Sequence, residues 1–234
     1  MSHVAIGLQV RLDSIRLPKK ALLPLAGRHM IAHAMEALSL LPGAERYILT
    51  DHPSAGVLKP IGEEYGFAVI PGPEDDVLRR YAMMAERSGA DILVRATGDN
   101  PLVSPRMARK AIELLIKSGA DLAAFDNLPL GTGVEALRAE AILKADAEAE
   151  EREEREHVTL HLYRHPERYK IDRRPAPPEA SMPEARVSLD TDDDYKVIQE
   201  IFRRAYSGRP LEVEEVIAEV RELIGSGLGA PCRR

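Results

Sequence analysis

The sequence predicts one α/β domain in which a mostly parallel β-sheet is covered by crossover helices. Strand-like and helix-like segments alternate along residues 4–125, which is the pattern of such a sheet. A length of 234 residues suits one large domain, and a hydrophobic content of 44% is enough for a core. Because no Gly/Ser-rich linker divides the chain, we place the domain at residues 1–225 and expect a flexible tail at 226–234.

Each predicted element rests on its apolar spacing and on the turn residues that bound it. Short apolar runs predict strands at residues 4–8, 46–50, 66–70, 91–96, 121–125, 169–174 and 186–189. Apolar residues at helical spacing predict helices at residues 29–41, 56–65, 74–88, 105–118, 137–156, 193–206 and 213–224. Proline and glycine mark residues 127–134 and 175–183 as loops.

The composition excludes several classes of protein. A net charge of −6 disfavours general nucleic-acid binding, which needs a basic face. No apolar segment reaches the length of a membrane span, and the first residues lack the features of a signal peptide, so we expect a cytoplasmic protein without a membrane partner. The single cysteine, Cys232, excludes an intrachain disulfide and is a poor catalytic candidate in the expected tail.

The loop after the first strand is strongly basic. Four cations fall within ten residues around Ser14, namely Arg11, Arg16, Lys19 and Lys20. Such a loop at the carboxyl end of a strand suits a polyanion such as a nucleoside triphosphate. A solvated basic loop is the alternative interpretation.

Two aspartates follow predicted strands far apart in the chain. Asp99 comes after the strand at 91–96, and Asp190 comes after the strand at 186–189. Since ligands of open α/β sheets lie outside the carboxyl ends of the strands, these carboxylates could converge on one Mg²⁺ ion. Alternatively, Asp99 only orders a turn, and Asp190 or Asp192 only caps the following helix.

Five segments carry a resemblance to a known family. RLDSIRLPKK resembles the RxxSxRLPxK signature of the CMP-sugar-acid synthetases, typified by CMP-KDO synthetase, and of the spore coat polysaccharide biosynthesis protein F family. GPEDDVLRRY, RATGDNPLVSP, EREHVTLHLYRHPERY and VSLDTDDDYKVI are similar to further motifs of the latter group, in the same order. Each match is weak alone, but five in order are specific.

The resemblance implies a glycosyltransferase-A-like nucleotidyltransferase fold that transfers CMP from CTP to an acceptor and releases pyrophosphate, assisted by Mg²⁺. It implies that Arg11, Lys20 and Asp99 are catalytic and that Asp99 and Asp190 bind the metal. It implies nucleotide contacts at Leu8, Gln9, Val10, Arg11, Ser14, Lys20, Asp75, Asp76, Arg79, Thr97 and Gly98. Arg16 matches the signature too, as a residue that contacts ligand or braces the loop.

Two positions depart from the family pattern. Lys19 stands where the family often has glycine, and Asp192 replaces the usual proline, adding a carboxylate beside Asp190.

The acceptor is left open as a sugar acid or a phosphate monoester. Its pocket is expected to be lined by residues 127–135, with Glu135, and 156–164. A nucleotide-sugar-dependent glycosyltransferase and a non-catalytic nucleotide-binding member of the family are the alternatives.

The histidines and one apolar stripe allow two more expectations. His157, His161 and His165 share a helical spacing that could bind zinc, but without HExxH or assisting cysteines we favour Glu156 and His157 as acceptor-orienting, capping or interface residues. The apolar stripe at 158–163 is consistent with a homodimer.

Overall fold

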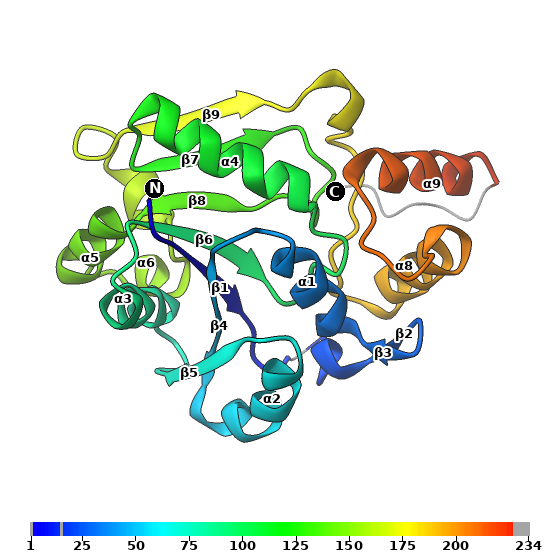
Figure 1. Ribbon diagram of the computed structural model, residues 1–234, viewed down its shortest axis with the longest axis horizontal. Helices are drawn as coiled ribbons and strands as arrows, with labels where there is room; N and C mark the ends of the chain where they lie inside the picture. Colours follow the sequence, from blue (N-terminus) through cyan, green and yellow to red (C-terminus); the bar gives the residue numbers. More distant parts are fainter. Residues whose placement is uncertain (1, 15, 227–234) are drawn as a thin grey trace.

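A computed structural model describes residues 2–14 and 16–226, and a seven-stranded sheet lies at its centre (Figure 1). The spatial order is β5-β4-β1-β6-β8-β7-β9. The strands are β1 (Val4–Gln9), β4 (Glu45–Asp51), β5 (Ala68–Gly72), β6 (Ile92–Thr97), β7 (Leu122–Asp126), β8 (Glu135–Arg138) and β9 (Ile171–Pro175). Only β8 runs antiparallel to its neighbours, so the predicted mixed, mostly parallel sheet is confirmed.

The remaining elements are helices and one small hairpin. The α-helices are α1 (Met30–Ser39), α2 (His52–Glu64), α3 (Val77–Ser88), α4 (Pro105–Ser118), α5 (Ala139–Glu148), α6 (Arg152–Glu156), α7 (Leu160–Arg164), α8 (Asp192–Ala205) and α9 (Val213–Gly225). Two 3₁₀ turns are η1 (Lys20–Leu22) and η2 (Pro178–Ala180). The hairpin, absent from the sequence-based expectations, pairs β2 (Pro24–Leu25) with β3 (Arg28–His29).

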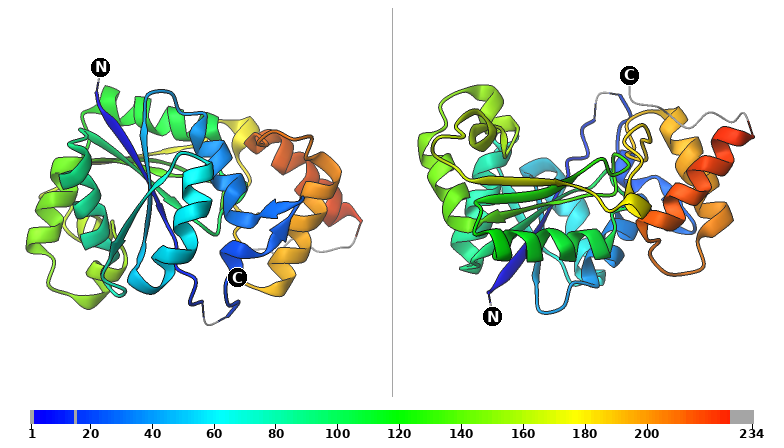
Figure 2. Two further views of the ribbon diagram at one scale, coloured as in Figure 1. Left: turned by 60° about the horizontal axis from the view of Figure 1, so that its bottom comes forward. Right: turned by 90° about the horizontal axis from the view of Figure 1, so that it is seen from above.

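Different helices cover the two faces of the sheet, so the domain has three layers (Figure 2). On one face, α3 and α5 share an apolar cluster with the sheet that includes Tyr81, Ile142 and Leu93. On the other face, α1, α2 and α4 cover residues such as Ile6 and Ile92. α8 and α9 pack on each other beside the β2–β3 hairpin at one end of the sheet.

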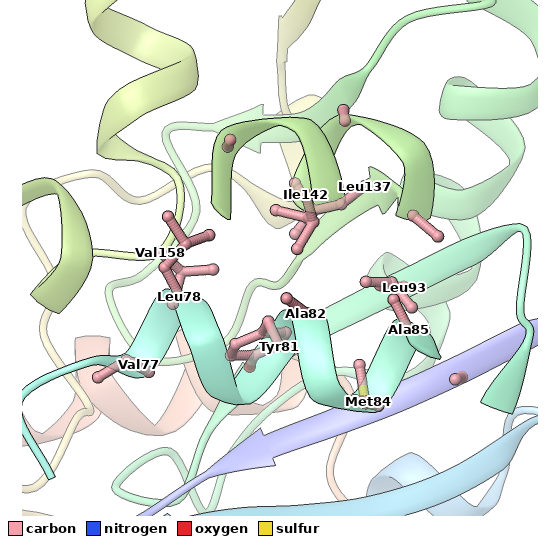
Figure 3. Close-up of a cluster of buried hydrophobic side chains, with 14 of the residues drawn as sticks. Val77, Leu78, Tyr81, Ala82, Met84, Ala85, Leu93, Leu137, Ile142 and Val158 are labelled. Atoms are coloured by element: carbon pink, nitrogen blue, oxygen red, sulfur yellow. The ribbon is translucent and has the colours of Figure 1, made fainter. Parts of the chain in front are cut away.

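The packing of α3 against the sheet and α5 positions one wall of the site. Tyr81 and Ala85 of α3 lie against Leu93 of the sheet and Ile142 of α5 (Figure 3). The Tyr81 hydroxyl donates a hydrogen bond to the Gly7 carbonyl oxygen at 2.8 Å. A Cβ at Gly7 would lie 2.7 Å from the Tyr81 ring, so glycine is what lets α3 approach β1 this closely.

The predicted helix at 137–156 is confirmed over most of its length, in α5 and α6, but its start and its continuity are wrong. Its first residues belong to β8, where Ala136 and Leu137 are buried between β6 and β7. The helix that follows stops because Ala149 adopts an extended backbone (φ −70°, ψ 118°), and α6 restarts after it. The exposed acidic residues on both sides of this break, among them Glu150, Glu151 and Glu153, give the sequence the pattern of a single solvated helix.

The predicted strand at 186–189 is wrong as a regular strand. Within the described residues this segment forms only an isolated parallel bridge, from Arg186 to Leu130. Its backbone is held instead by the Leu189 N–H, which donates to the Asp99 carbonyl oxygen at 2.8 Å. This bond brings the two predicted metal-binding segments together.

The apolar stripe at 158–163 faces inward. Val158 and Leu162 are fully buried in the cluster below α3 and α5, so the stripe gives no support for a homodimer. The domain limit at residue 225 coincides with the end of α9 but stays a prediction, because residues 227–234, including Cys232, lie outside the described residues. No helix in the described part of the chain combines the length and apolar character that crossing a membrane requires.

Candidate active site

A cleft of about 460 Å³ opens at the carboxyl ends of β1 and β6. It is lined by Gln9, Val10, Arg11, Ser14, Arg16, Lys20, Ala21, Glu74, Val77, Arg80, Thr97, Gly98, Asp99, Glu156, His157 and Asp190. The structure therefore brings together most of the residues implied to bind nucleotide and both implied metal ligands. Leu8 is fully buried in the core and does not line the cleft.

Lys20 lies at the centre of the polar floor of the cleft, which Lys20, Asp99 and Asp190 form. Its Nζ donates to Asp99 Oδ2 at 2.9 Å, to Asp190 Oδ1 at 2.8 Å and to the Leu189 carbonyl oxygen at 2.7 Å. All three bonds use a side chain that is only 15% exposed. Lys20 thereby holds the two carboxylates on one point, although they come from segments far apart in the sequence.

Asp190 is held in its charged form by several cations. Burial alone would raise the pKa of Asp190, but the hydrogen bond and charge of Lys20, with the charges of Arg16 and Arg186, hold that pKa below its usual value. Arg16 Nη2 lies 3.2 Å from Asp190 Oδ1. In the structure, Arg16 therefore braces the loop against Asp190, one of the two roles expected for it.

The turn after β6 fits tightly against the turn after β1. The Gly98 N–H donates to the Gln9 carbonyl oxygen at 2.8 Å, and a Cβ at Gly98 would lie 2.7 Å from Val10 Cβ. Glycine at this position lets the backbone of both turns line the cleft. Lys19 has φ +55°, a left-handed conformation that glycine adopts without strain, which explains why glycine would be favoured there.

The side chains of Asp75, Asp76 and Arg79 do not line the cleft. Asp76 caps α3 by accepting from the Arg79 N–H at 2.8 Å, and it also accepts from Arg155 of α6. Arg79 pairs with Glu86 and Asp146, and Asp75 pairs weakly with Arg152 at 3.4 Å. These contacts give the segment a structural role, since they tie α3 to α5 and α6.

The Asp76–Arg155 pair fixes the opposite wall of the cleft. Arg155 Nε lies 2.8 Å from Asp76 Oδ2, and the same guanidinium contacts Asp146 at 2.6 Å. The next two residues along the chain, Glu156 and His157, line the cleft. The Asp76–Arg155 contact thus connects the motif at 72–81 with the motif at 154–169. This contact positions Glu156 and His157 at the cleft.

Glu135 lies behind the cleft in a polar network. It pairs with Arg95 at 2.8 Å and accepts hydrogen bonds from Thr159 and Tyr163. Burial raises its pKa, but Arg95 and these hydroxyl groups outweigh that effect and hold the pKa low. Arg95 in turn donates to Gln9, which does line the cleft. Glu135 therefore contacts the cleft only through other side chains.

His157 lines the cleft, whereas His161 and His165 lie elsewhere. His161 and His165 instead gather around Glu154, with ligand atoms of all three within 4.8 Å of one another. His161 Nδ1 lies 2.7 Å from Glu154 Oε2, and Arg164 Nη1 lies 3.6 Å from Glu154 Oε1. Because Glu154 is already hydrogen-bonded to His161 and lies beside Arg164, we interpret the cluster as a polar contact joining α6 to α7.

Sequence reasoning missed Arg80 and Val77. Both lie one helical turn apart on α3, so they share a face, and that face borders the cleft. The motif GPEDDVLRRY contains both residues, but Asp75, Asp76 and Arg79 were the residues of this motif expected to contact the nucleotide. The spacing of three residues between Val77 and Arg80 was the signal that could have identified them.

A mostly parallel sheet whose strand ends present a basic loop and two converging carboxylates defines a nucleotidyltransferase of the three-layer α/β/α type. A profile of the cytidylyltransferase family matches residues 5–217, and the chain belongs to this family of enzymes. The resemblance stated from the motifs is thereby confirmed.

Individual relatives agree with this assignment. The chain is 28% identical over 224 residues to the spore coat polysaccharide biosynthesis protein SpsF of Bacillus subtilis, covering 93% of each protein. A cytidylyltransferase structure from Leptospira borgpetersenii is similar with a TM-score of 0.84 and 22% identity, covering 97% of this chain and 96% of that one. CMP:2-keto-3-deoxy-manno-octonic acid synthetase complexed with CTP is similar with a TM-score of 0.67 and 18% identity, over 87% and 99% of the two chains. Both structures confirm the fold.

Proposed function

We propose that this enzyme transfers CMP from CTP to a small polar acceptor, a sugar acid or a phosphate monoester, and releases pyrophosphate. The observation that carries the proposal is the convergence of Asp99 and Asp190 on Lys20 beneath a basic loop. A reaction at phosphorus that expels pyrophosphate needs positive charge on the leaving group and a metal site beside it. The cleft provides residues for both.

The nucleotide would lie along the loop between β1 and η1. Arg11 and Lys20 are the cations we assign to the triphosphate, with Ser14 as a neutral hydrogen-bond donor beside them. The close-packed turns at Val10 and Gly98 both line the cleft, where they are placed to contact the flat base and the ribose. The CTP complex of a similar fold supports CTP as the substrate.

Asp99 and Asp190 would hold Mg²⁺. Their carboxylate oxygens are the hard ligands this ion prefers, and both already reach one point, the Lys20 ammonium group. When bound, such an ion would supply positive charge that offsets the charge of the phosphates. Lys20 would keep the two carboxylates oriented toward one point.

The chemistry requires no covalent intermediate. A carboxylate, hydroxyl or phosphate oxygen of the acceptor attacks the α-phosphorus and forms the new O–P bond; a hydroxyl group releases its proton to water as this bond forms. The bond from the α-phosphorus to the bridging oxygen breaks, and pyrophosphate leaves with that electron pair. Arg11 and Lys20 offset the charge that develops on it, while Glu156 and His157 orient the acceptor from the opposite wall.

Two measurements test the proposal. Thermal unfolding with each of CTP, UTP, ATP and GTP plus Mg²⁺ should show the largest rise in melting temperature with CTP, since a ligand stabilises the state that binds it. Pyrophosphate release from CTP should then depend on one member of a panel of sugar acids and phosphate monoesters. An equal response to all four nucleotides would contradict the cytidylyl assignment. Because CMP:2-keto-3-deoxy-manno-octonic acid synthetase has a similar fold, sugar acids are the first acceptors to test.

A further inference from the structure

Arg80 is a buried cation whose hydrogen-bonding groups are not satisfied within the protein. Only 3% of the residue is exposed, and its Nε and Nη1 atoms have no hydrogen-bond partner among the described residues. A buried guanidinium without partners is costly, because it loses its hydration and gains nothing in return. Such a group is expected to have a partner that is not part of the chain.

The acids nearest to Arg80 are already engaged. Asp51 accepts the Ser54 N–H at 2.7 Å as the cap of α2, and Asp76 is paired with Arg155. Burial, with a smaller contribution from Arg11, lowers the pKa of Arg80, while Asp51 and Asp76 offset this only in part. The surroundings thus leave the Arg80 charge poorly compensated.

The position of Arg80 is enforced by the fold. A Cβ at Gly72, at the end of β5, would lie 2.7 Å from Arg80 Cγ, so the absence of a side chain there is what admits the arginine stem. The residue lines the same cleft as Arg11, and the charge of Arg11 acts on Arg80. Although four carboxylates also border this cleft, the two arginines repel each other, so an anionic or electron-rich group beside them would be stabilised.

We propose that Arg80 is a nucleotide-binding residue that takes its missing hydrogen-bond partners from acceptor atoms of the bound nucleotide. The acceptors are either phosphate oxygens or the O2 and N3 atoms of cytosine, which carry no proton. The inference rests on the proposed function, which supplies the nucleotide. In the free enzyme, Arg80 is then an unsatisfied cation that lowers the stability of the protein, and nucleotide binding removes this destabilisation.

The test is Arg80→Met, which keeps an unbranched stem beside Gly72 and removes the charge. Because the free protein loses an unpaired buried cation, we expect the melting temperature of the nucleotide-free variant to stay the same or rise. Hydrogen bonds to a charged group are strong, so CTP affinity should fall about 10- to 100-fold. Arg87→Met, an exposed arginine of the same helix, is the control and should match the wild type in both measurements.

Comparison of CTP with UTP and pyrophosphate separates the sources of the acceptor atoms. If Arg80 binds phosphate, the variant loses affinity for CTP and UTP by the same factor, and it loses affinity for pyrophosphate as well where the contact is to the β- or γ-phosphate. If Arg80 reads the base, pyrophosphate binding is unchanged and the ratio of CTP to UTP affinity falls, because N3 of uracil carries a proton. Either pattern supports the inference.

Wild-type affinity for CTP and pyrophosphate in the Arg80→Met variant would overturn the inference while leaving the proposed function intact. A wild-type protein that binds pyrophosphate through Arg80 but shows no response to CTP would overturn the proposed function alone. Binding of neither ligand by the wild type would overturn both. If Arg80→Met fails to fold, Arg80→Lys, which keeps the charge but loses the paired donors, should show the same loss of affinity.

Discussion

Replacing Lys20 by methionine removes the side chain that contacts both Asp99 and Asp190. The variant keeps the aliphatic stem but leaves Asp99 and Asp190 facing the same point without the ammonium group between them. Removal of one partner of a fully buried ion pair costs about 3–5 kcal/mol. Here the side chains of Asp99 and Asp190 are 27% and 18% exposed, and Asp190 retains Arg16 and Arg186. We therefore expect a loss of about 2 kcal/mol.

Thermal unfolding in EDTA measures this loss. For a domain of this size, about 2 kcal/mol lowers the melting temperature by about 4–8 °C. Added Mg²⁺ should raise the melting temperature of Lys20→Met more than that of the wild type, because in the variant the ion also replaces the positive charge that Lys20 supplies to both carboxylates in the wild type. Lys19→Met is the matched control: Lys19 is exposed, and the change should leave the melting temperature nearly unaltered.

Two results would refute this reasoning. A melting temperature of Lys20→Met within about 1 °C of the wild type would mean that the carboxylates are well solvated and that Lys20 does not hold them. A Mg²⁺ effect no larger than that of the wild type would mean that Asp99 and Asp190 do not form one cation site.

Three further predictions concern neighbouring residues. Asp99→Asn should slow pyrophosphate release from CTP by about 100-fold or more while the protein still unfolds cooperatively, and an unchanged rate would remove Asp99 from the metal site. Lys19→Gly should raise the free energy of unfolding by about 0.5–1 kcal/mol, measured in urea, because it relieves the left-handed conformation at φ +55°. For Asp190, a depressed pKa in the folded state means that its ionised form contributes stability above the unfolded-state pKa of about 3.9 and loses it as the pH falls through the lower folded-state value. The stability difference between wild type and Asp190→Asn should therefore be constant from pH 7 to about pH 5 and shrink below about pH 4, and a difference that already shrinks between pH 7 and pH 5 would contradict this.

Long regular elements were the part of the fold that could be predicted. The helix at 105–118 matches α4 at both ends, because Ser104 caps it, Pro105 starts it and Gly119 ends it with φ +62°. β8 was missed because its four residues are too few to show a period, and the buried surface that selects a strand there comes from β6 and β7. Tertiary pairing, which no local pattern encodes, decided that segment.

The site also has a part that could be predicted from the sequence and a part that depends on tertiary packing. Arg11, Lys20, Asp99 and Asp190 could be proposed because the motifs fix their residue types, and all four line the cleft. A motif does not state which of its side chains faces a ligand, so Asp76 was assigned to the nucleotide although it caps a helix and pairs with Arg155. Orientation on α3 follows from the packing of Tyr81 against Gly7, a contact between residues 74 positions apart.

The contacts of Lys20 also limit when the site can exist during synthesis of the chain. Lys20 reaches Asp99 across 79 positions and Asp190 across 170, and the Leu189 backbone closes onto Asp99 only after that segment has been made. Contacts of such long sequence separation form late, because the loop they close must first be ordered. A nascent chain that ends before residue 190 has the basic loop and one carboxylate but no complete floor, so a competent cleft appears only when nearly the whole domain has left the ribosome.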